Sequence, residues 1–359
     1  MKETKFKNTE IGMIPEEWEV KKLGTVFDIG NGRDYKHLNT GKIPVYGTGG
    51  LMTYVNEYLY DGETVCIGRK GTINMPQYHN GKIWTVDTLF YTYNFRKTDV
   101  KFLYYLAQII DWNVYNTATG VPSLTSRNVS NILVSLPPLH EQHRIASALT
   151  SIDNLISSLG KLIEKKKNIK QGAMQQLLTG RTRLKGFSEP WVEKKLGELF
   201  EIGNGKDYKN LKSGPIPVFG TGGLMTYVNE YLYDGETICI GRKGTIDKPQ
   251  YHKGKIWTVD TLFYTYRFKD INVKYLYYLS TTINWNEYNT ATGVPSLTSQ
   301  NILKIKVVLP LEEEQQVIAT ILTKMDDEIT ALEAKKVKYE AIKQGMMQQL
   351  LTGKIRLVS

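Results

Sequence analysis

A segment of eighteen residues occurs twice in this chain, and it restricts the possible folds more than any other feature of the sequence. Residues 47–64 recur without change at 220–237. The same offset of 173 positions relates Trp18 to Trp191 and continues almost to the C-terminus without an insertion. Repeats that stack into solenoids are about 20–50 residues long, so this much longer period indicates a duplicated domain.

Length and charge are consistent with two domains and an acidic partner. A chain of 359 residues is long enough for two domains, each with its own core. The net charge of +10 favours a polyanionic partner, of which nucleic acid is the commonest. No apolar run approaches the roughly 20 residues of a membrane span, and the first residues lack the apolar segment of a signal peptide.

The two cysteines occupy the same position in the two repeats. Cys66 and Cys239 each lie inside a short apolar stretch. They are typical of small core residues in a reducing compartment, and we predict neither a disulfide nor a metal pair. We therefore expect a cytoplasmic protein.

Each repeat begins with a strand-rich globular region. In the first repeat, residues 43–46, 64–67 and 82–93 are rich in aromatic and β-branched side chains and are separated by glycine-containing turns. This pattern predicts a largely antiparallel, irregular sheet. Residues 100–110 have apolar side chains at helical spacing instead, which predicts a helix packed on that sheet.

A long helix is predicted after each globular region. The first begins after Pro138 and ends near Gly180, and the second begins after Pro310 and ends near Gly353. About 40 residues at 1.5 Å each give a length on the order of 60 Å. Apolar residues spaced alternately by four and three form a coiled-coil seam in each helix: Ile145, Leu149, Ile152, Ile156, Leu159 and Ile163, and then Ile318, Leu322, Met325, Ile329 and Leu332.

The predicted fold class is α+β, with two mixed, strand-rich globular domains separated by two long helices. Antiparallel pairing of the helices as a coiled coil would relate the two repeats by an approximate two-fold axis. The alternative is that each helix packs on its own domain. The predicted boundaries are 1–138 for the first domain, 139–180 for the first helix, 181–190 for a linker, 191–310 for the second domain, and 311–359 for the second helix and a C-terminal tail.

The sequence contains no recognisable catalytic or metal-binding motif. There is no phosphate-binding loop of the P-loop or dinucleotide type, and no zinc spacing of histidines or cysteines. His140 and His143 are replaced by other residues in the second repeat, which argues against a metal pair. His79 and His252 are retained in both repeats, but without a nucleophile or base partner they are typical of structural histidines. We predict no catalytic residue and no metal site.

Three polar, glycine-containing loops recur in each repeat and are the predicted DNA-binding surfaces. Arginine can donate two parallel hydrogen bonds to a guanine edge or a phosphate, lysine provides a point charge, and hydroxyls suit either group. Ordinary solvated turns are the alternative for each loop. The candidate residues are Asn31, Arg33, Tyr35, Lys36, Arg69, Lys70, Thr72, Thr117, Thr119 and Ser123, and, in the second repeat, Asn204, Lys206, Tyr208, Lys209, Arg242, Lys243, Thr245, Thr290, Thr292 and Ser296.

Three pairs of motifs point to a known family. One pair opens the globular regions, another starts the long helices and the third ends them: residues 14–24 and 191–199, 141–146 and 314–319, and 174–180 and 347–357. Because the three motifs occur twice in the same order, the chain resembles the DNA-specificity subunit of type I restriction–modification systems over nearly its whole length.

The resemblance implies two target-recognition domains, each reading one half of a split DNA site, with the long helices setting the distance between the halves. It implies methylase subunits as partners, two in number, which supply S-adenosylmethionine chemistry on adenine. A separate restriction subunit would use ATP and Mg²⁺ to translocate and cut. This chain itself would be non-catalytic and would hold no cofactor.

One departure from the family pattern affects the expected target. The recognition domains of the family usually differ while the helices are alike, whereas here the globular regions are almost identical. We therefore expect both domains to read the same half-site, which makes the target an interrupted palindrome. Two other classes of function stay open: a self-contained restriction endonuclease, and a coiled-coil adaptor that binds only protein.

Overall fold

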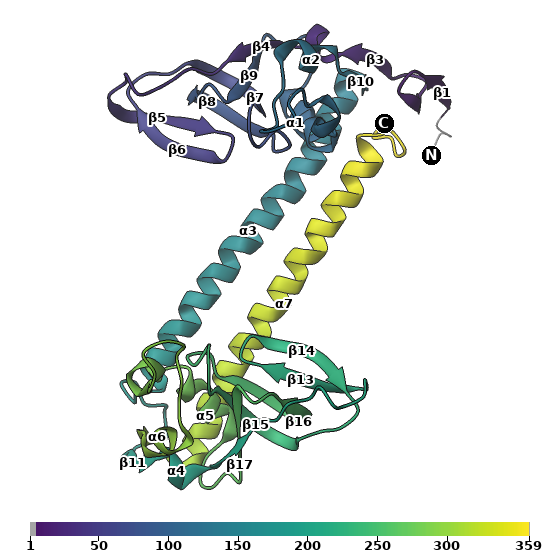
Figure 1. Cartoon of the computed structure of the whole chain (residues 1–359). Helices are drawn as coiled ribbons and strands as arrows, with labels where there is room; N and C mark the ends of the chain where they lie inside the picture. The colour runs from purple at the N-terminus through teal and green to yellow at the C-terminus, as the bar shows by residue number, and fades with distance from the viewer. Residues whose placement is uncertain (1–4, 359) are drawn as a thin grey trace. The chain divides into compact units, whose positions relative to one another are not determined.

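The computed structural model describes residues 5–358 and divides into two compact units (Figure 1). Unit 1 consists of the described part of residues 1–160 together with 334–358, and unit 2 consists of residues 161–333. Both divisions between the units fall inside the long helices. Each unit therefore contains the globular region of one repeat and the final part of the helix that belongs to the other repeat.

A six-stranded sheet forms the body of unit 1 (Figure 1). All neighbouring strands are antiparallel except β5 and β8, which pair in parallel through Val45 with Trp84 and Tyr46 with Thr85. This confirms the predicted, largely antiparallel sheet. In spatial order the strands are β4 (Asp28–Asn31), β9 (Leu89–Tyr93), β7 (Tyr60–Gly68), β8 (Gln77–Thr85), β5 (Thr40–Gly47) and β6 (Gly50–Val55).

Smaller elements complete unit 1. The predicted helix is α1 (Val100–Ile109), which packs against β7 and β8 and is capped by the Asp99 carboxylate accepting from the Phe102 amide at 2.7 Å. A second helix is α2 (Ser126–Asn131), and η1 (Leu23–Thr25) and η2 (Trp112–Tyr115) are single turns. Two further strand pairs are β1 (Phe6–Thr9) with β2 (Gly12–Pro15), which we did not predict, and β3 (Glu19–Lys22) with β10 (Leu133–Leu136).

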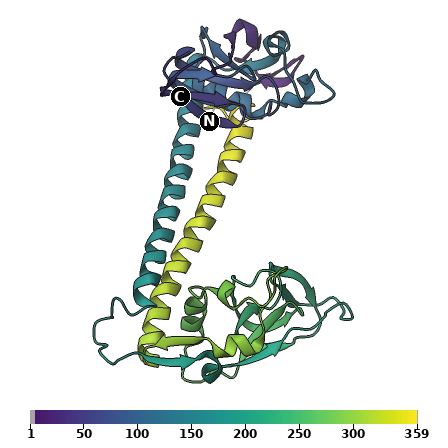
Figure 2. The ribbon, with the colours of Figure 1, turned by 60° about the vertical axis from the view of Figure 1, so that its left-hand side comes forward.

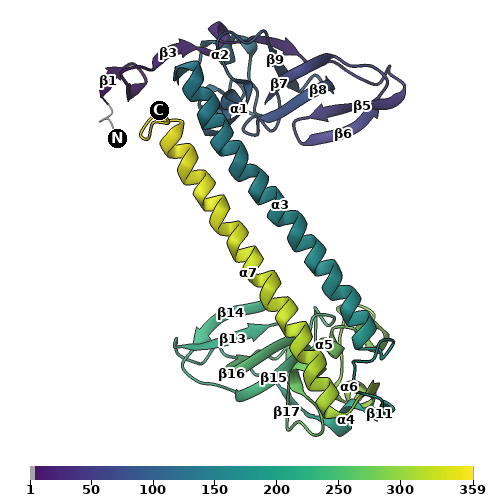
Figure 3. The same cartoon turned by 180° about the vertical axis from the view of Figure 1, so that it is seen from behind.

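Unit 2 repeats this architecture without the β1–β2 hairpin (Figure 3). Its sheet has the equivalent order: β12 (Glu201–Asn204), β17 (Leu262–Tyr266), β15 (Tyr233–Gly241), β16 (Gln250–Thr258), β13 (Ile216–Gly220) and β14 (Gly223–Val228). The other elements are β11 (Val192–Lys195) paired with β18 (Lys306–Leu309), α4 (Leu196–Leu199), α5 (Val273–Ser280), η3 (Trp285–Tyr288) and α6 (Ser299–Lys304).

The core of each unit lies where the sheet meets the helices. In unit 1, Trp18, Phe90, Phe102 and Trp112 are almost completely buried in one apolar cluster. The two cysteines are free and fully buried, as predicted. Burial raises the pKa of the Cys66 thiol to about 12, so the thiol stays protonated and unreactive at neutral pH.

The long helices begin and end close to the predicted positions. Helix α3 spans Leu139–Leu177 and helix α7 spans Glu312–Leu350. Each is followed by the predicted glycine in a left-handed conformation, with φ of +69° at Gly180 and +71° at Gly353. A side chain is strained in this conformation, and glycine therefore ends both helices.

The beginning of α3 and the end of α7 run side by side in unit 1 (Figures 1 and 2). Asp153 lies in the first half of α3 and Lys343 near the end of α7, and their side chains form an ion pair of 2.7 Å. The equivalent pair in unit 2 joins Lys170 of α3 to Asp326 of α7 at 2.5 Å. The helices are therefore antiparallel within each unit, as expected for an antiparallel coiled coil.

Each long helix also packs on the globular region that precedes it, which was the alternative arrangement considered from the sequence. The Asp153 carboxylate accepts a hydrogen bond of 2.8 Å from the Tyr105 hydroxyl of α1, in the globular region that precedes α3. Ile145 and Leu149 of α3 share one core with Phe102 and with Met347 of α7. The start of each helix thus packs on its own domain and on the end of the other helix at once. None of the helices in residues 5–358 is both long and apolar enough to cross a membrane.

Candidate functional site

The predicted loops of unit 1 meet at a tight turn formed by residues 86–89. The turn is closed by the Leu89 amide, which donates to the Val86 carbonyl at 2.9 Å. The first loop is attached at the strand end before this turn, because the Arg33 amide donates to the Thr85 carbonyl at 2.8 Å. The second loop is attached within it, because the Arg69 amide donates to the Thr88 carbonyl at 2.8 Å. The sheet order brings these segments together.

The second and third loops are joined by backbone hydrogen bonds. Lys70 and Ser123 form an isolated antiparallel bridge, and the Gly71 amide donates to the Pro122 carbonyl at 2.8 Å. Glycine is required beside this junction, because a Cβ atom on Gly68 would lie 2.1 Å from the Thr72 carbonyl oxygen. We call residues 30–36, 68–72, 86–89 and 115–126 the loop cluster of unit 1.

Unit 2 has an equivalent loop cluster, formed by residues 203–209, 241–245, 259–262 and 288–299. The Lys206 amide donates to the Thr258 carbonyl and the Arg242 amide to the Thr261 carbonyl, both at 2.8 Å. Lys243 and Ser296 form the same isolated bridge. Within each unit, the three predicted loops are therefore joined to one another through the backbone.

The candidate residues differ in how far they are available to a ligand. Tyr35 and Tyr208 pack against small apolar clusters under the first loop, so their rings support the loop. The Thr117 and Thr290 hydroxyls donate to the carbonyls of Ser123 and Ser296 at 3.1 Å. Thr72, Ser123, Thr245 and Ser296 are half-buried. Exposed are Asn31, Arg33, Lys36, Arg69, Lys70 and Thr119, with Asn204, Lys206, Lys209, Arg242, Lys243 and Thr292 in unit 2.

The arginine of the second loop is held at the surface by two contacts. The Arg69 guanidinium donates to the Asp87 carbonyl at 3.3 Å and lies 5.8 Å from the centroid of the Phe90 ring. Arg242 makes the equivalent contacts in unit 2, at 3.4 Å to the Asp260 carbonyl and 5.8 Å to the Phe263 ring. A guanidinium has five N–H donors, so most of its donors are available to a base edge or a phosphate.

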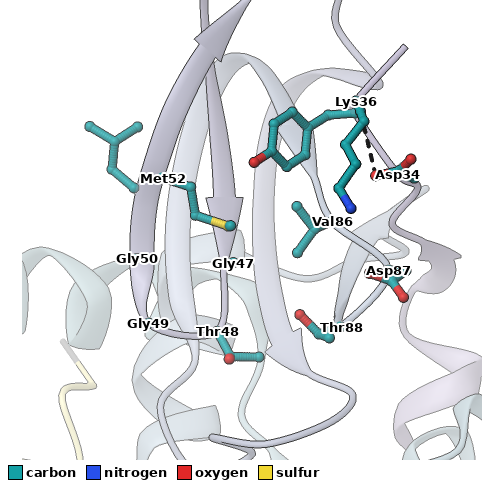
Figure 4. A pocket seen from close by; sticks show the side chains of 12 residues that line it. Asp34, Lys36, Gly47, Thr48, Gly49, Gly50, Met52, Val86, Asp87 and Thr88 are labelled. Carbon is teal, nitrogen blue, oxygen red and sulfur yellow. Dashed lines mark hydrogen bonds between the residues drawn. The ribbon is translucent and has the colours of Figure 1, made fainter. Parts of the chain in front are cut away.

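A pocket of about 780 Å³ lies beside the loop cluster of unit 1, between residues 34–36, the tip of the β5–β6 hairpin and residues 86–88 (Figure 4). Its wall includes Met52, whose sulfur would lie 2.7 Å from a Cβ atom on Gly47. In unit 2 a hollow of about 640 Å³ lies on the other side of the equivalent turn, beside Arg242, Lys243 and Asp260.

Sequence reasoning did not include this hairpin or the turn at residues 86–89 among the candidate binding segments. Leu51 and Met52 are 52% and 55% exposed at the hairpin, and Leu224 and Met225 are equally exposed in unit 2. Exposed large apolar side chains are common on protein surfaces, so their exposure by itself does not indicate a binding site. The available signal was the hairpin's place inside the longest unchanged segment of the duplication.

The histidines support the hairpin. The His79 ring stacks on Tyr46 at 3.8 Å between centroids, and its Nε2 lies 3.2 Å from the Gln77 side-chain oxygen. The Gln77 amide donates to the Gly47 carbonyl at 2.9 Å. Burial lowers the pKa of His79 to about 4, so the ring is neutral at neutral pH. Between residues 5 and 358, no three histidine, cysteine, aspartate or glutamate side chains are grouped so that they could hold a metal ion.

Comparison with known families gives a match in each repeat. The family model described as the type I restriction modification DNA specificity domain matches residues 15–171 and 188–342. The MjaVIII specificity subunit of a type I restriction enzyme from Methanocaldococcus jannaschii is 26% identical over 433 aligned residues, covering 99% of this chain and 97% of its own length. The putative MjaX specificity subunit of the same organism is 27% identical, covering 99% and 98%.

Solved structures show the same fold. The S subunit of a type I restriction–modification system from M. genitalium has a TM-score of 0.70 at 19% identity, covering 93% of this chain and 96% of that one. A chain from a study of complex assembly and conformational transition of the type I R-M system has a TM-score of 0.57 at 16% identity, covering 95% and 99%. At these identities the likeness concerns the fold alone.

Proposed function

This chain belongs to the family of the type I restriction modification DNA specificity domain, and from that premise we propose that each of its two units reads one half of a bipartite DNA site. The curated relatives are named as specificity subunits, the recognition components of such systems. The proposal concerns how this particular chain reads its target.

The duplicated loop cluster is the observation that carries the proposal. In both units the exposed cations and hydroxyls belong to loops that the backbone joins around one turn, and the three loops differ at a single residue, Arg33 in unit 1 and Lys206 in unit 2. Both side chains are cationic. Apart from this residue the two sets of loops have the same donors and acceptors, so we expect both units to recognise the same base sequence, which makes the target an interrupted palindrome.

Catalysis and its cofactors are assigned to partner chains in this proposal. Methylase subunits, two in number, bring S-adenosylmethionine and modify adenine. A restriction subunit brings ATP and Mg²⁺. This chain contributes recognition and holds no cofactor of its own.

Methylome sequencing tests the proposal directly. A cell lacking other adenine methylation receives this chain with its cognate methylase, and the modified positions are read on both strands. We expect methyladenine in one interrupted palindrome. An asymmetric bipartite motif would contradict identical half-sites while leaving DNA recognition intact. Absence of new methylation with an active methylase would instead favour an adaptor that binds only protein.

Salt dependence tests whether the loop cluster is the DNA-binding surface. Each phosphate contact contributes about 0.9 to the slope of log binding constant against log salt concentration. Lys70→Ala combined with Lys243→Ala should reduce the magnitude of that slope by about 2 in the assembled complex. The control, Lys22→Ala with Lys195→Ala, removes two exposed lysines from β3 and β11, outside the cluster. Equal slopes for the two variants would refute the placement of the surface.

A further inference from the structure

An exposed carboxylate lies in the turn at the centre of each loop cluster. Asp87 in unit 1 and Asp260 in unit 2 occupy equivalent positions and are exposed. Within residues 5–358, neither carboxylate forms an ion pair or a hydrogen bond with another side chain or with a backbone amide. The nearby Asp34 differs, because its carboxylate accepts from the Lys36 amide at 3.4 Å.

The turn itself does not account for an aspartate at this position. Aspartate is common in turns because its side chain accepts hydrogen bonds from the local backbone. This turn is closed by the backbone bond between Leu89 and Val86. The structure gives the Asp87 carboxylate no such bond, and the same residue nevertheless stands in both units.

The side chains of Lys36 and Arg69 near this turn are cationic, whereas Asp87 carries a negative charge. Asp87 lines the same pocket as Lys36 (Figure 4), and its carbonyl accepts from Arg69. Cations suit the DNA backbone, whereas a carboxylate is repelled by phosphates at short range. A carboxylate inside a cationic, DNA-facing surface therefore needs a hydrogen-bond donor as its target, and in the major groove the donors are the amino groups of cytosine and adenine.

We propose that Asp87 and Asp260 each accept a hydrogen bond from the N4 amino group of a cytosine in the major groove. This assignment rests on the proposed function and names one base in each half-site. Cytosine fits better than adenine, because adenine carries the N7 acceptor beside its amino group, and N7 would face the second carboxylate oxygen. The carbonyl of the same aspartate orients the neighbouring arginine, which places an acceptor and a strong donor side by side.

The test combines Asp87→Asn with Asp260→Asn in the full chain with its cognate methylase. An asparagine side chain both donates and accepts, which suits the adenine edge. We expect the methylated motif to keep its spacer and its other bases, while one position in each half-site changes from cytosine to adenine or becomes degenerate. In competition binding, discrimination of cytosine against adenine at that position should fall by about tenfold to a hundredfold.

A single substitution provides an internal comparison. Asp87→Asn alone should alter one half-site and leave the other unchanged, which converts a palindrome into an asymmetric motif. The control, Asp61→Asn with Asp234→Asn, removes the same charge from exposed positions on β7 and β15. It should leave the motif unaltered.

Three results would overturn the assignment. The first is a wild-type motif with no cytosine in either half-site on either strand. The second is an unchanged motif in the double variant, accompanied by a uniform gain in affinity for all duplexes, which would mean that the aspartates only repel phosphates. The third is a double variant whose motif loses specificity at a position that is not cytosine in the wild-type motif. Failure of the wild-type chain to direct any methylation would instead refute the proposed function.

Discussion

At the scale of single residues, the two retained histidines show how a titratable side chain can serve structure alone. His79 and His252 stack on Tyr46 and Phe219, and each lies beside a glutamine that donates to a carbonyl at the tip of the neighbouring hairpin. Burial lowers both histidine pKa values to about 4. The structural role predicted from the sequence agrees with this geometry, although the stacking partner was not foreseen.

The lowered pKa values predict a specific acid sensitivity. An unfolded histidine binds a proton below about pH 6.5, whereas these folded histidines resist protonation until about pH 4. The unfolded state therefore binds more protons between these values, and the free energy of unfolding falls as the pH is lowered through this window. His79→Gln with His252→Gln should lose less stability between pH 7.5 and pH 5 than the wild-type chain, measured as urea midpoints.

A control substitution separates this effect from general acid sensitivity. His140→Gln removes an exposed histidine and should leave the wild-type acid loss unchanged. An equal acid loss in the wild-type chain and in the His79/His252 variant would show that other groups cause it.

At the scale of elements, the loop cluster depends on close approach of backbone segments. The segment after β7 turns back so tightly that a Cβ atom on Gly68 would lie 2.1 Å from the Thr72 carbonyl oxygen. Backbone cannot move aside as a flexible side chain can, so the loop must shift if a side chain is introduced. The loop that carries Arg69 and Lys70 is thus positioned by sterics as well as by hydrogen bonds.

Gly68→Ala should therefore weaken DNA binding through the shape of the loop. We expect overpacking to cost about 1–3 kcal/mol of unfolding free energy, and DNA affinity of the complex to fall because Arg69 and Lys70 move. Gly49→Ala is the matched control in the turn between β5 and β6, since its Cβ would meet nothing within 4 Å. Equal urea midpoints and equal DNA affinities for the two variants would contradict the steric argument.

At the scale of the whole molecule, each unit contains residues that follow the long helix of the other repeat. In unit 1, buried Glu141 at the start of α3 accepts from Trp18 at 3.1 Å and from Arg356, beyond the end of α7, at 2.7 Å. In unit 2, Glu314 accepts from Arg183 at 2.8 Å. Glu141 and Arg356 thus form a buried ion pair.

Arg356→Ala should destabilise unit 1 strongly, because it leaves the Glu141 carboxylate buried without its cation. Breaking a buried pair costs about 3–5 kcal/mol. Arg183→Ala should cost unit 2 less, because the Arg183 side chain is 28% exposed and the Arg356 side chain only 8%. Hydrogen exchange, resolved by peptide, would locate each effect. If the Arg356 variant showed faster hydrogen exchange only in unit 2, this result would contradict the conclusion that the residues after α7 stabilise unit 1.

Much of the architecture was predictable because its signals are local or duplicated. Short segments rich in aromatic and β-branched residues predicted the strands, and prolines and glycines predicted the limits of α3 and α7 within a few residues. The β1–β2 hairpin was missed because it lies outside the duplicated region. The candidate cations and hydroxyls were chosen from loop composition, and their function stays a prediction.

The sequence by itself determined the duplication, the two kinds of element in each repeat and the polar loops, because each depends on neighbouring residues or on direct comparison of the repeats. Only the tertiary structure decided which distant segments meet. The placement of β9 between β4 and β7 brings Arg33 and Arg69 to the turn that carries Asp87. Folding also joins Glu141 to Arg356, 215 positions away. Such contacts arise from the order of strands and the return of a helix, which no local pattern of residues encodes.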